Sequence, residues 1–142
     1  MKFSKGVHVV LLLSGSLITS TYLRKLLQPT FYVISERSLD KACQLLLTTT
    51  IDCLILDEKL ELNCQLPALK KIASYKKSQF LPIFLIKKIL TKSLRQQAID
   101  LGATQFIQDP FNDREVKLKL ALCLNLHQVH EKVAMTGKKL LS

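Results

Sequence analysis

Short apolar runs alternate with segments of helical periodicity along this chain, and this alternation limits the fold more than any other feature. We expect five buried strands, at residues 7–13, 31–35, 51–56, 80–86 and 104–107. Each strand is followed by apolar residues spaced three or four apart, which predicts a helix. Helices between successive strands allow the strands to lie parallel. The sequence therefore predicts a (βα)5 fold, a three-layer α/β sandwich with a central parallel sheet.

Capping residues indicate where several of these helices begin and end. Gly102 can close the helix that precedes the fifth strand, because glycine tolerates the backbone conformation of a C-cap. Pro29 ends the first helix. The residues that can cap helix N-termini are Ser14-Gly15-Ser16, Ser38, Thr91, and Asn112 or Asp113.

Charge and cysteine content restrict the classes of partner and cofactor. The chain has 21 Lys and Arg against 11 Asp and Glu, a net charge of +10. This balance favours an acidic protein, nucleic acid or anionic lipid as partner, but a solvated basic surface explains it as well. The four cysteines include no CxxC pair and no zinc-type spacing, so we expect no metal and no cofactor. Thiols that look unpaired suit a reducing compartment, and we expect a cytoplasmic protein.

The N-terminal segment allows two interpretations. Two lysines followed by an apolar run resemble the start of a secretory signal. However, His8 interrupts this run and Ser14-Gly15-Ser16 ends it, which favours a buried strand. No run approaches the roughly 20 apolar residues of a membrane span, so we expect no membrane segment.

The strand ends are the places to look for a functional site. In parallel α/β sheets, binding residues gather at the carboxyl ends of the strands. Ser14 follows the first predicted strand, Asp57 the third, Lys87 the fourth and Asp109 follows the fifth. We therefore expect these four residues to lie near one another.

Three segments make residues 5 to 125 resemble the receiver domains of two-component response regulators. "AIDLGATQFIQDPFN" (98–112) is similar to the family's segment from Ala-Gly-Ala through the fifth strand to Lys-Pro-Phe. "IDCLILDEKL" (51–60) is similar to the strand that ends in the phosphoacceptor aspartate, and "LPIFLIKK" (81–88) to the strand that ends in Thr or Ser. The resemblance implies a CheY-like, flavodoxin-like fold with sheet order 2-1-3-4-5, and a signalling role rather than an enzymatic one.

The resemblance places the family's site residues one by one. Asp57 matches the phosphoacceptor, whereas the acidic residues that hold Mg²⁺ fall on Ser14 and Gly15. The family's hydroxyl residue falls on Lys87, and its lysine falls on Asp109. Serine and a glycine carbonyl are poor substitutes for Mg²⁺-binding carboxylates. We therefore interpret the chain as a degenerate receiver, or pseudo-receiver, that is not efficiently phosphorylated. The resemblance also implies that the peptide before Pro110 can be cis.

Three hypotheses for Asp57 remain open at this stage. Lys87 could pair with Asp57, Asp109 or both, since unit charges about 4 Å apart at an effective dielectric of about 20 attract by about 4 kcal/mol before desolvation. The three side chains could instead point into water. Alternatively, the chain is an atypical receiver that is still phosphorylated on Asp57.

The resemblance further implies an output face formed by the fourth helix, the fifth strand and the fifth helix. Phe106 matches the family's switch aromatic on this face. The face would dock a protein partner or a second copy of the chain, or it is ordinary solvated surface. A basic nucleic-acid-binding module is the alternative from another class, although no nucleic-acid motif is visible. The candidate residues of the face are Lys88, Lys92, Arg95, Lys117 and Lys119.

The final helix is predicted to run from residue 113 to about residue 135, beyond the edge of the domain. Leu122, Leu126, Val129 and Val133 form a heptad-like seam, which predicts a dimer or linker helix. We therefore divide the chain into a receiver-like domain (1–125) and a helical extension, or linker to an effector domain (126–142).

Overall fold

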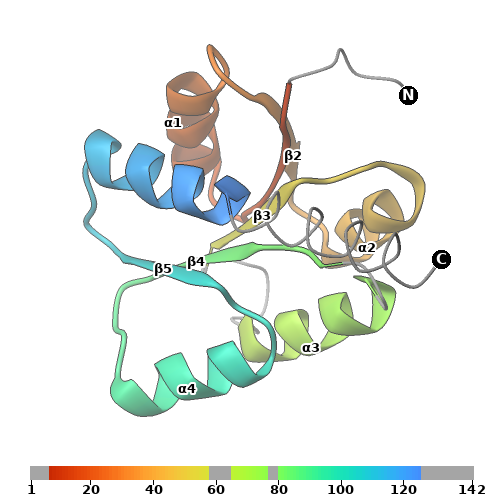
Figure 1. Cartoon of the computed structure of the whole chain (residues 1–142), viewed down its shortest axis with the longest axis vertical. Coiled ribbons are helices and arrows are strands. Elements are labelled where there is room, and N and C mark those ends of the chain that lie inside the picture. Colours follow the sequence, from red (N-terminus) through yellow and green to blue (C-terminus); the bar gives the residue numbers. More distant parts are fainter. Residues whose placement is uncertain (1–6, 58–64, 77–79, 126–142) are drawn as a thin grey trace, which may run out of the picture.

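The computed structural model describes residues 7–57, 65–76 and 80–125. Strands and helices alternate strictly, as predicted, and helical residues 113–125 form the described part of a final helix (Figure 1). The other elements are β1 (Val9–Leu13), α1 (Leu17–Leu27), β2 (Tyr32–Glu36), α2 (Leu39–Thr48), β3 (Cys53–Asp57), α3 (Gln65–Lys76), β4 (Ile83–Lys87), α4 (Lys92–Asp100) and β5 (Gln105–Gln108).

The five strands form one parallel sheet in the order β2-β1-β3-β4-β5, which confirms the predicted topology. β1 ends at Leu13 as predicted, and the other four strands each end one residue later than the sequence predicted. Asp57 is thus the last residue of β3 rather than the first residue of the loop. Because the strands are parallel, their carboxyl ends meet along one edge of the sandwich.

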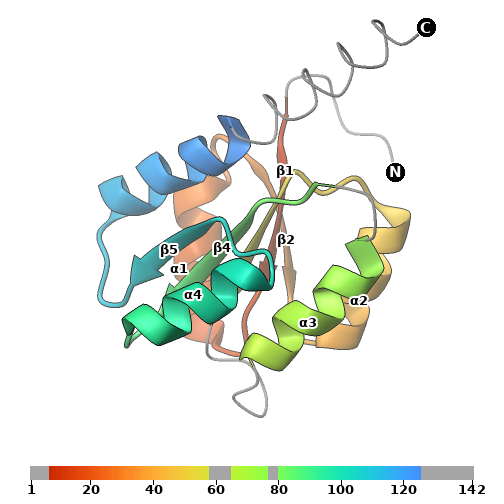
Figure 2. The ribbon, with the colours of Figure 1, turned by 60° about the horizontal axis from the view of Figure 1, so that its bottom comes forward.

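Helices cover both faces of the sheet (Figures 1 and 2). α1 and the final helix pack on one face, and α2, α3 and α4 pack on the other. Alternate residues of β1 contribute to the two resulting cores: Leu11 lies in the core under α2 and α3, and Leu12 in the core under α1. Burial on both sides explains why this strand is apolar at every position.

The predicted helix caps are confirmed in the described residues. Ser16, Ser38 and Thr91 each accept a hydrogen bond from the backbone N–H three residues later. Asn112, rather than Asp113, caps the final helix, since its Oδ1 accepts from the N–H of Glu115 at 2.8 Å. Gly102 has φ of 106°, so it ends α4 in the left-handed region that favours glycine.

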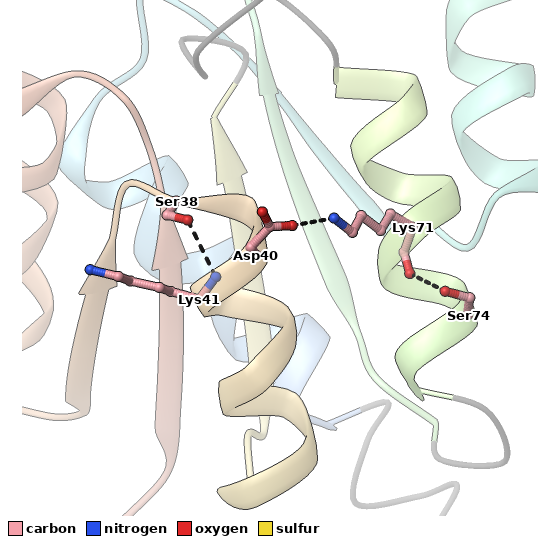
Figure 3. A network of polar contacts seen from close by, with 5 residues as sticks. All are labelled: Ser38, Asp40, Lys41, Lys71 and Ser74. Carbon is pink, nitrogen blue, oxygen red and sulfur yellow. Dashed lines mark hydrogen bonds and ion pairs between the residues drawn. The ribbon is translucent and has the colours of Figure 1, made fainter.

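A polar network joins α2 and α3 on the outer surface (Figure 3). Lys71 of α3 donates a hydrogen bond to Asp40 of α2, and this contact raises the pKa of the lysine. Ser74 donates to the carbonyl oxygen of Lys71 at 2.6 Å, and Ser38 caps α2 beside Lys41. The Lys71–Asp40 contact links α2 to α3 across the surface.

Candidate functional site

Two buried polar residues meet at the carboxyl ends of β1 and β3. Ser14 and Asp57 are each 1% exposed, and they are the buried polar or charged residues of the described core. The hydroxyl of Ser14 donates to Oδ2 of Asp57 at 2.8 Å. The register explains this contact, because Leu13 lies opposite Leu56 and the next residue of each strand is therefore also opposite.

The backbone holds Ser14 in this position. Its N–H donates to the carbonyl oxygen of Glu36 at 3.1 Å, and its Oγ accepts from the N–H of Ser16 at 3.1 Å. The hydroxyl proton is directed to the Asp57 carboxylate at 2.8 Å, because the other possible acceptor, the carbonyl oxygen of Ser16, is farther away at 3.4 Å. Hydrogen bonding of this kind offsets the cost of burying a carboxylate.

The sequence left open whether Lys87 pairs with Asp57 or Asp109, and the described residues do not show such a pair. Lys87 is the half-buried last residue of β4. The two strand ends are joined through the backbone, where the N–H of Asp109 donates to the carbonyl oxygen of Lys87 at 2.8 Å. Moving the ammonium group next to buried Asp57 would desolvate both charges, which opposes such a pair.

The segment after β5 has the backbone that the resemblance implied. The peptide between Asp109 and Pro110 is cis. Asp109 is half-buried at the carboxyl end of the sheet, where it adds a second carboxylate to this side of the molecule. The residue at this position is thus an anion and not a lysine.

The residues that meet here do not fit a Mg²⁺ site. Mg²⁺ requires near-octahedral oxygen coordination, usually from one or more carboxylates and water. An oxygen of Asp57 already accepts from Ser14, and β1 is followed by Ser14 and Gly15 rather than by carboxylates. Within the described ranges, no group of three or more His, Cys, Asp or Glu side chains could hold a metal ion.

Phe106 is held by contacts from both neighbouring helices. Its side chain is 6% exposed, and the guanidinium of Arg95 on α4 lies 4.9 Å from the ring centroid, a cation–π contact. From the final helix, Lys119 donates to the carbonyl oxygen of Phe106 at 2.6 Å and pairs with Glu115 at 3.3 Å. Only the Glu115–Lys119 pair could be found from sequence, because its members are four residues apart on one helix.

The other predicted output residues lie on the surface of α4 and the final helix and directly after β4. Leu122, the first residue of the predicted seam, is 45% exposed. Leu126, Val129 and Val133 lie outside the described residues, as does the whole segment 126–142. The exposed members of the predicted face are Lys88, Lys92, Arg95 and Lys117, and Lys119 is half-buried.

Three cysteines lie in the two cores as free thiols, namely Cys43, Cys53 and Cys123, whereas Cys64 lies outside the described residues. Burial raises the pKa of Cys43, and a hydrogen bond with Cys123 together with burial raises the pKa of Cys53. The thiols of Cys43 and Cys53 are therefore protonated at neutral pH, and they pack as small apolar side chains.

The fold is that of receiver domains. The receiver domain of an HD domain-containing protein from Pseudomonas fluorescens Pf-5 superposes with a TM-score of 0.79 at 20% identity, covering 93% of this chain and 97% of the other. The chemotaxis protein CheY4 of Vibrio cholerae superposes with a TM-score of 0.76 at 20% identity, covering 84% of this chain and 100% of the other.

A third similar structure is the receiver domain of a sensor histidine kinase from Pseudomonas aeruginosa PAO1, which has a magnesium ion coordinated in its active-site cleft. It has a TM-score of 0.73 at 16% identity and covers 84% of this chain and 99% of its own. No protein-family model and no curated protein sequence matches this chain. At these identities the structural likeness establishes the fold.

None of the helices in the described ranges is both long enough and apolar enough to cross a bilayer.

Proposed function

We propose that this chain is a degenerate receiver module of the two-component response-regulator type, which acts through protein–protein contact without phosphotransfer. The observation that carries the proposal is the hydrogen bond from Ser14 to buried Asp57. A serine hydroxyl, held by the backbone, contacts the carboxylate that matches the phosphoacceptor position.

The chemistry of phosphotransfer is poorly supported by these residues. A carboxylate that attacks a phosphoryl group must approach a centre that carries negative charge itself, and cations normally reduce this repulsion. Asp57 is almost inaccessible to solvent, and Asp109 occupies the position that matches the family's lysine. Phosphorylation would therefore require a carboxylate to leave a buried hydrogen bond without gaining a compensating cation.

Contact with a protein partner is supported by the surface around Phe106. Ile99 lies four residues after Arg95 and thus on the same side of α4, and it is 45% exposed. Leu122 lies three residues after Lys119 on the final helix and is equally exposed. Apolar side chains bordered by lysines are typical of a docking surface. We infer that a protein partner, which can be a second copy, binds this face.

The buried free thiols support a reducing compartment, and we propose that the module works in the cytoplasm. We also propose that residues 126–142 continue the final helix as a seam for pairing or as a linker to an effector. The exposure of Leu122 supports this role for the helix.

Intact-mass spectrometry after incubation with acetyl phosphate or phosphoramidate and Mg²⁺ tests the proposal. We expect no adduct of about 80 Da, the mass of one phosphoryl group. The matched control is Asp57→Asn under the same conditions. An Mg²⁺-dependent adduct on the unmodified chain that is lost in Asp57→Asn would show a working phosphoacceptor and reject the proposal.

A further inference from the structure

The strand β2 forms one edge of the sheet, and part of its backbone faces outward. The N–H of Tyr32 donates to His8 at 2.9 Å, and the carbonyl oxygen of Glu36 accepts from Ser14 at 3.1 Å, so Tyr32 and Glu36 face β1. Since backbone groups alternate along a strand, those of Val33 and Ser35 point away from the sheet. In the described structure these four N–H and C=O groups have no hydrogen-bond partner in the protein.

This edge lacks the features that usually protect an edge strand. Protein edges are commonly blocked by lysine, proline or a bulge. The sequence of β2 is YVISE, which contains strand-forming residues and neither lysine nor proline. The edge can therefore accept the backbone of an added strand.

Exposed cations lie on both sides of this edge. Tyr22 of α1 contacts Phe111, which precedes the final helix, and Arg24 is two positions, or about 200°, further around α1. Arg24 thus lies on the side of α1 away from the final helix, toward β2. On α2, Lys41 extends away from Asp40 and Lys71, toward the β2 side of the sheet (Figure 3).

The local acidic group at this edge is already engaged. The carboxylate of Glu36 accepts from the N–H groups of Arg37 and Ser38 at 3.1 and 3.2 Å. Exposed Arg37 adds a third cation near the end of β2. The charge around the edge is therefore complementary to an acidic chain.

We propose that the outer edge of β2 binds an extended, acidic segment of a partner protein, which adds to the sheet as a sixth strand. Backbone hydrogen bonds to Val33 and Ser35 would provide the register, and Arg24 and Lys41 would select acidic side chains. A second copy of this chain fits less well, because each copy has a net charge of +10 and the copies repel each other.

This site is independent of the face proposed above for protein contact. β2 and β5 are opposite edges of the sheet. At the β5 edge, Arg95 and Lys119 already converge on Phe106 from the neighbouring helices. If no peptide bound at β2, that result would therefore not count against the proposal that the chain acts without phosphotransfer.

Amide hydrogen exchange and fluorescence anisotropy test the proposal. The probe is a labelled, terminally blocked peptide of repeated Glu-Glu-Val-Val, which places Glu on both faces of an extended strand, and its control replaces every Glu by Lys. We expect the Glu peptide to bind and to slow exchange of the Val33 and Ser35 N–H groups. N-methylation of the peptide at alternate residues should abolish binding, because it removes the backbone donors.

Charge-reversal variants test the selection of acidic side chains. Lys41→Glu and Arg24→Glu should each weaken binding of the Glu peptide by about tenfold. Lys70→Glu is the matched control, because Lys70 is exposed on α3 away from this edge. It should leave the affinity nearly unchanged.

Three results would overturn the proposal. The first is unchanged exchange of Val33 and Ser35 at saturating peptide, and the second is equal affinity for the Lys peptide. The third is a concentration-dependent dimer, seen by sedimentation without peptide, that slows exchange of the same two amides. That result would assign the edge to a second copy instead of an acidic partner.

Discussion

At the scale of single residues, the main feature is a buried carboxylate held by a serine. Asp57 is the last residue of β3, and the hydroxyl of Ser14 donates a hydrogen bond to its carboxylate. A neutral hydroxyl is a modest partner for a carboxylate, but it costs far less to bury than a second charge. This difference explains why Ser14, and not Lys87, contacts Asp57.

Ser14→Ala should lower the free energy of unfolding by about 1 to 3 kcal/mol, because a buried carboxylate oxygen loses its hydrogen-bond donor. Urea denaturation at neutral pH measures the change. Ser20→Ala on α1 is a suitable control, since the Ser20 side chain forms no hydrogen bond with the described residues. Equal stability of the Ser14 variant and the control would mean that the hydrogen bond does not stabilise the fold.

At the scale of secondary-structure elements, local chemistry determines where the helices begin and end. Ser16, Ser38 and Thr91 are caps by virtue of their own side chains and the N–H groups three residues later. The ends of the strands depend on pairing with neighbouring strands, which are distant in the sequence. β3 includes Asp57 because its neighbour β4 extends far enough for Ile86 to pair with it, whereas the pairing with β1 ends at Leu56.

Gly102→Ala should destabilise the protein by about 1 to 2 kcal/mol, because a β-carbon is unfavourable at the left-handed backbone of this residue. Thermal or urea unfolding measures the loss. Gly15→Ala is the control, since Gly102 is the glycine with positive φ in the described ranges. If both variants lost the same amount of stability, the effect would not come from the backbone conformation at Gly102.

At the scale of the whole molecule, the sheet order brings distant strand ends together and decides which groups share the crevice. The described residues supply a Ser14–Asp57 pair and no cluster of carboxylates suited to Mg²⁺. A ligand that binds the folded state raises stability, so a chain without a metal site should not respond to the metal.

The melting temperature should therefore stay unchanged when about 10 mM Mg²⁺ is added. The double variant Ser14→Asp/Gly15→Asp places carboxylates where the family has them, and its melting temperature should rise by a few degrees with the same addition. Scanning calorimetry with and without Mg²⁺ makes the comparison. A clear rise for the unmodified chain would show that it binds the metal.

Much of the fold could be predicted from the pattern of apolar residues. The alternation of strands and helices follows from the periodicity, and the caps follow from single residues such as Ser38 and Gly102. The cis peptide before Pro110 agreed with the resemblance. Positions of the site residues could be predicted too, because each of them ends or follows a strand.

The sequence by itself determined the order of the elements, the parallel sheet and the presence of Ser14 and Gly15, without a carboxylate, directly after β1. Only the tertiary structure decided which side chains meet: Ser14 with Asp57, and Arg95 and Lys119 around Phe106. It also decided that the outward backbone groups of Val33 and Ser35 have no hydrogen-bond partner among the described residues. Periodicity reports which face of an element is buried, whereas contacts between distant residues depend on strand register and on the cost of desolvating each group.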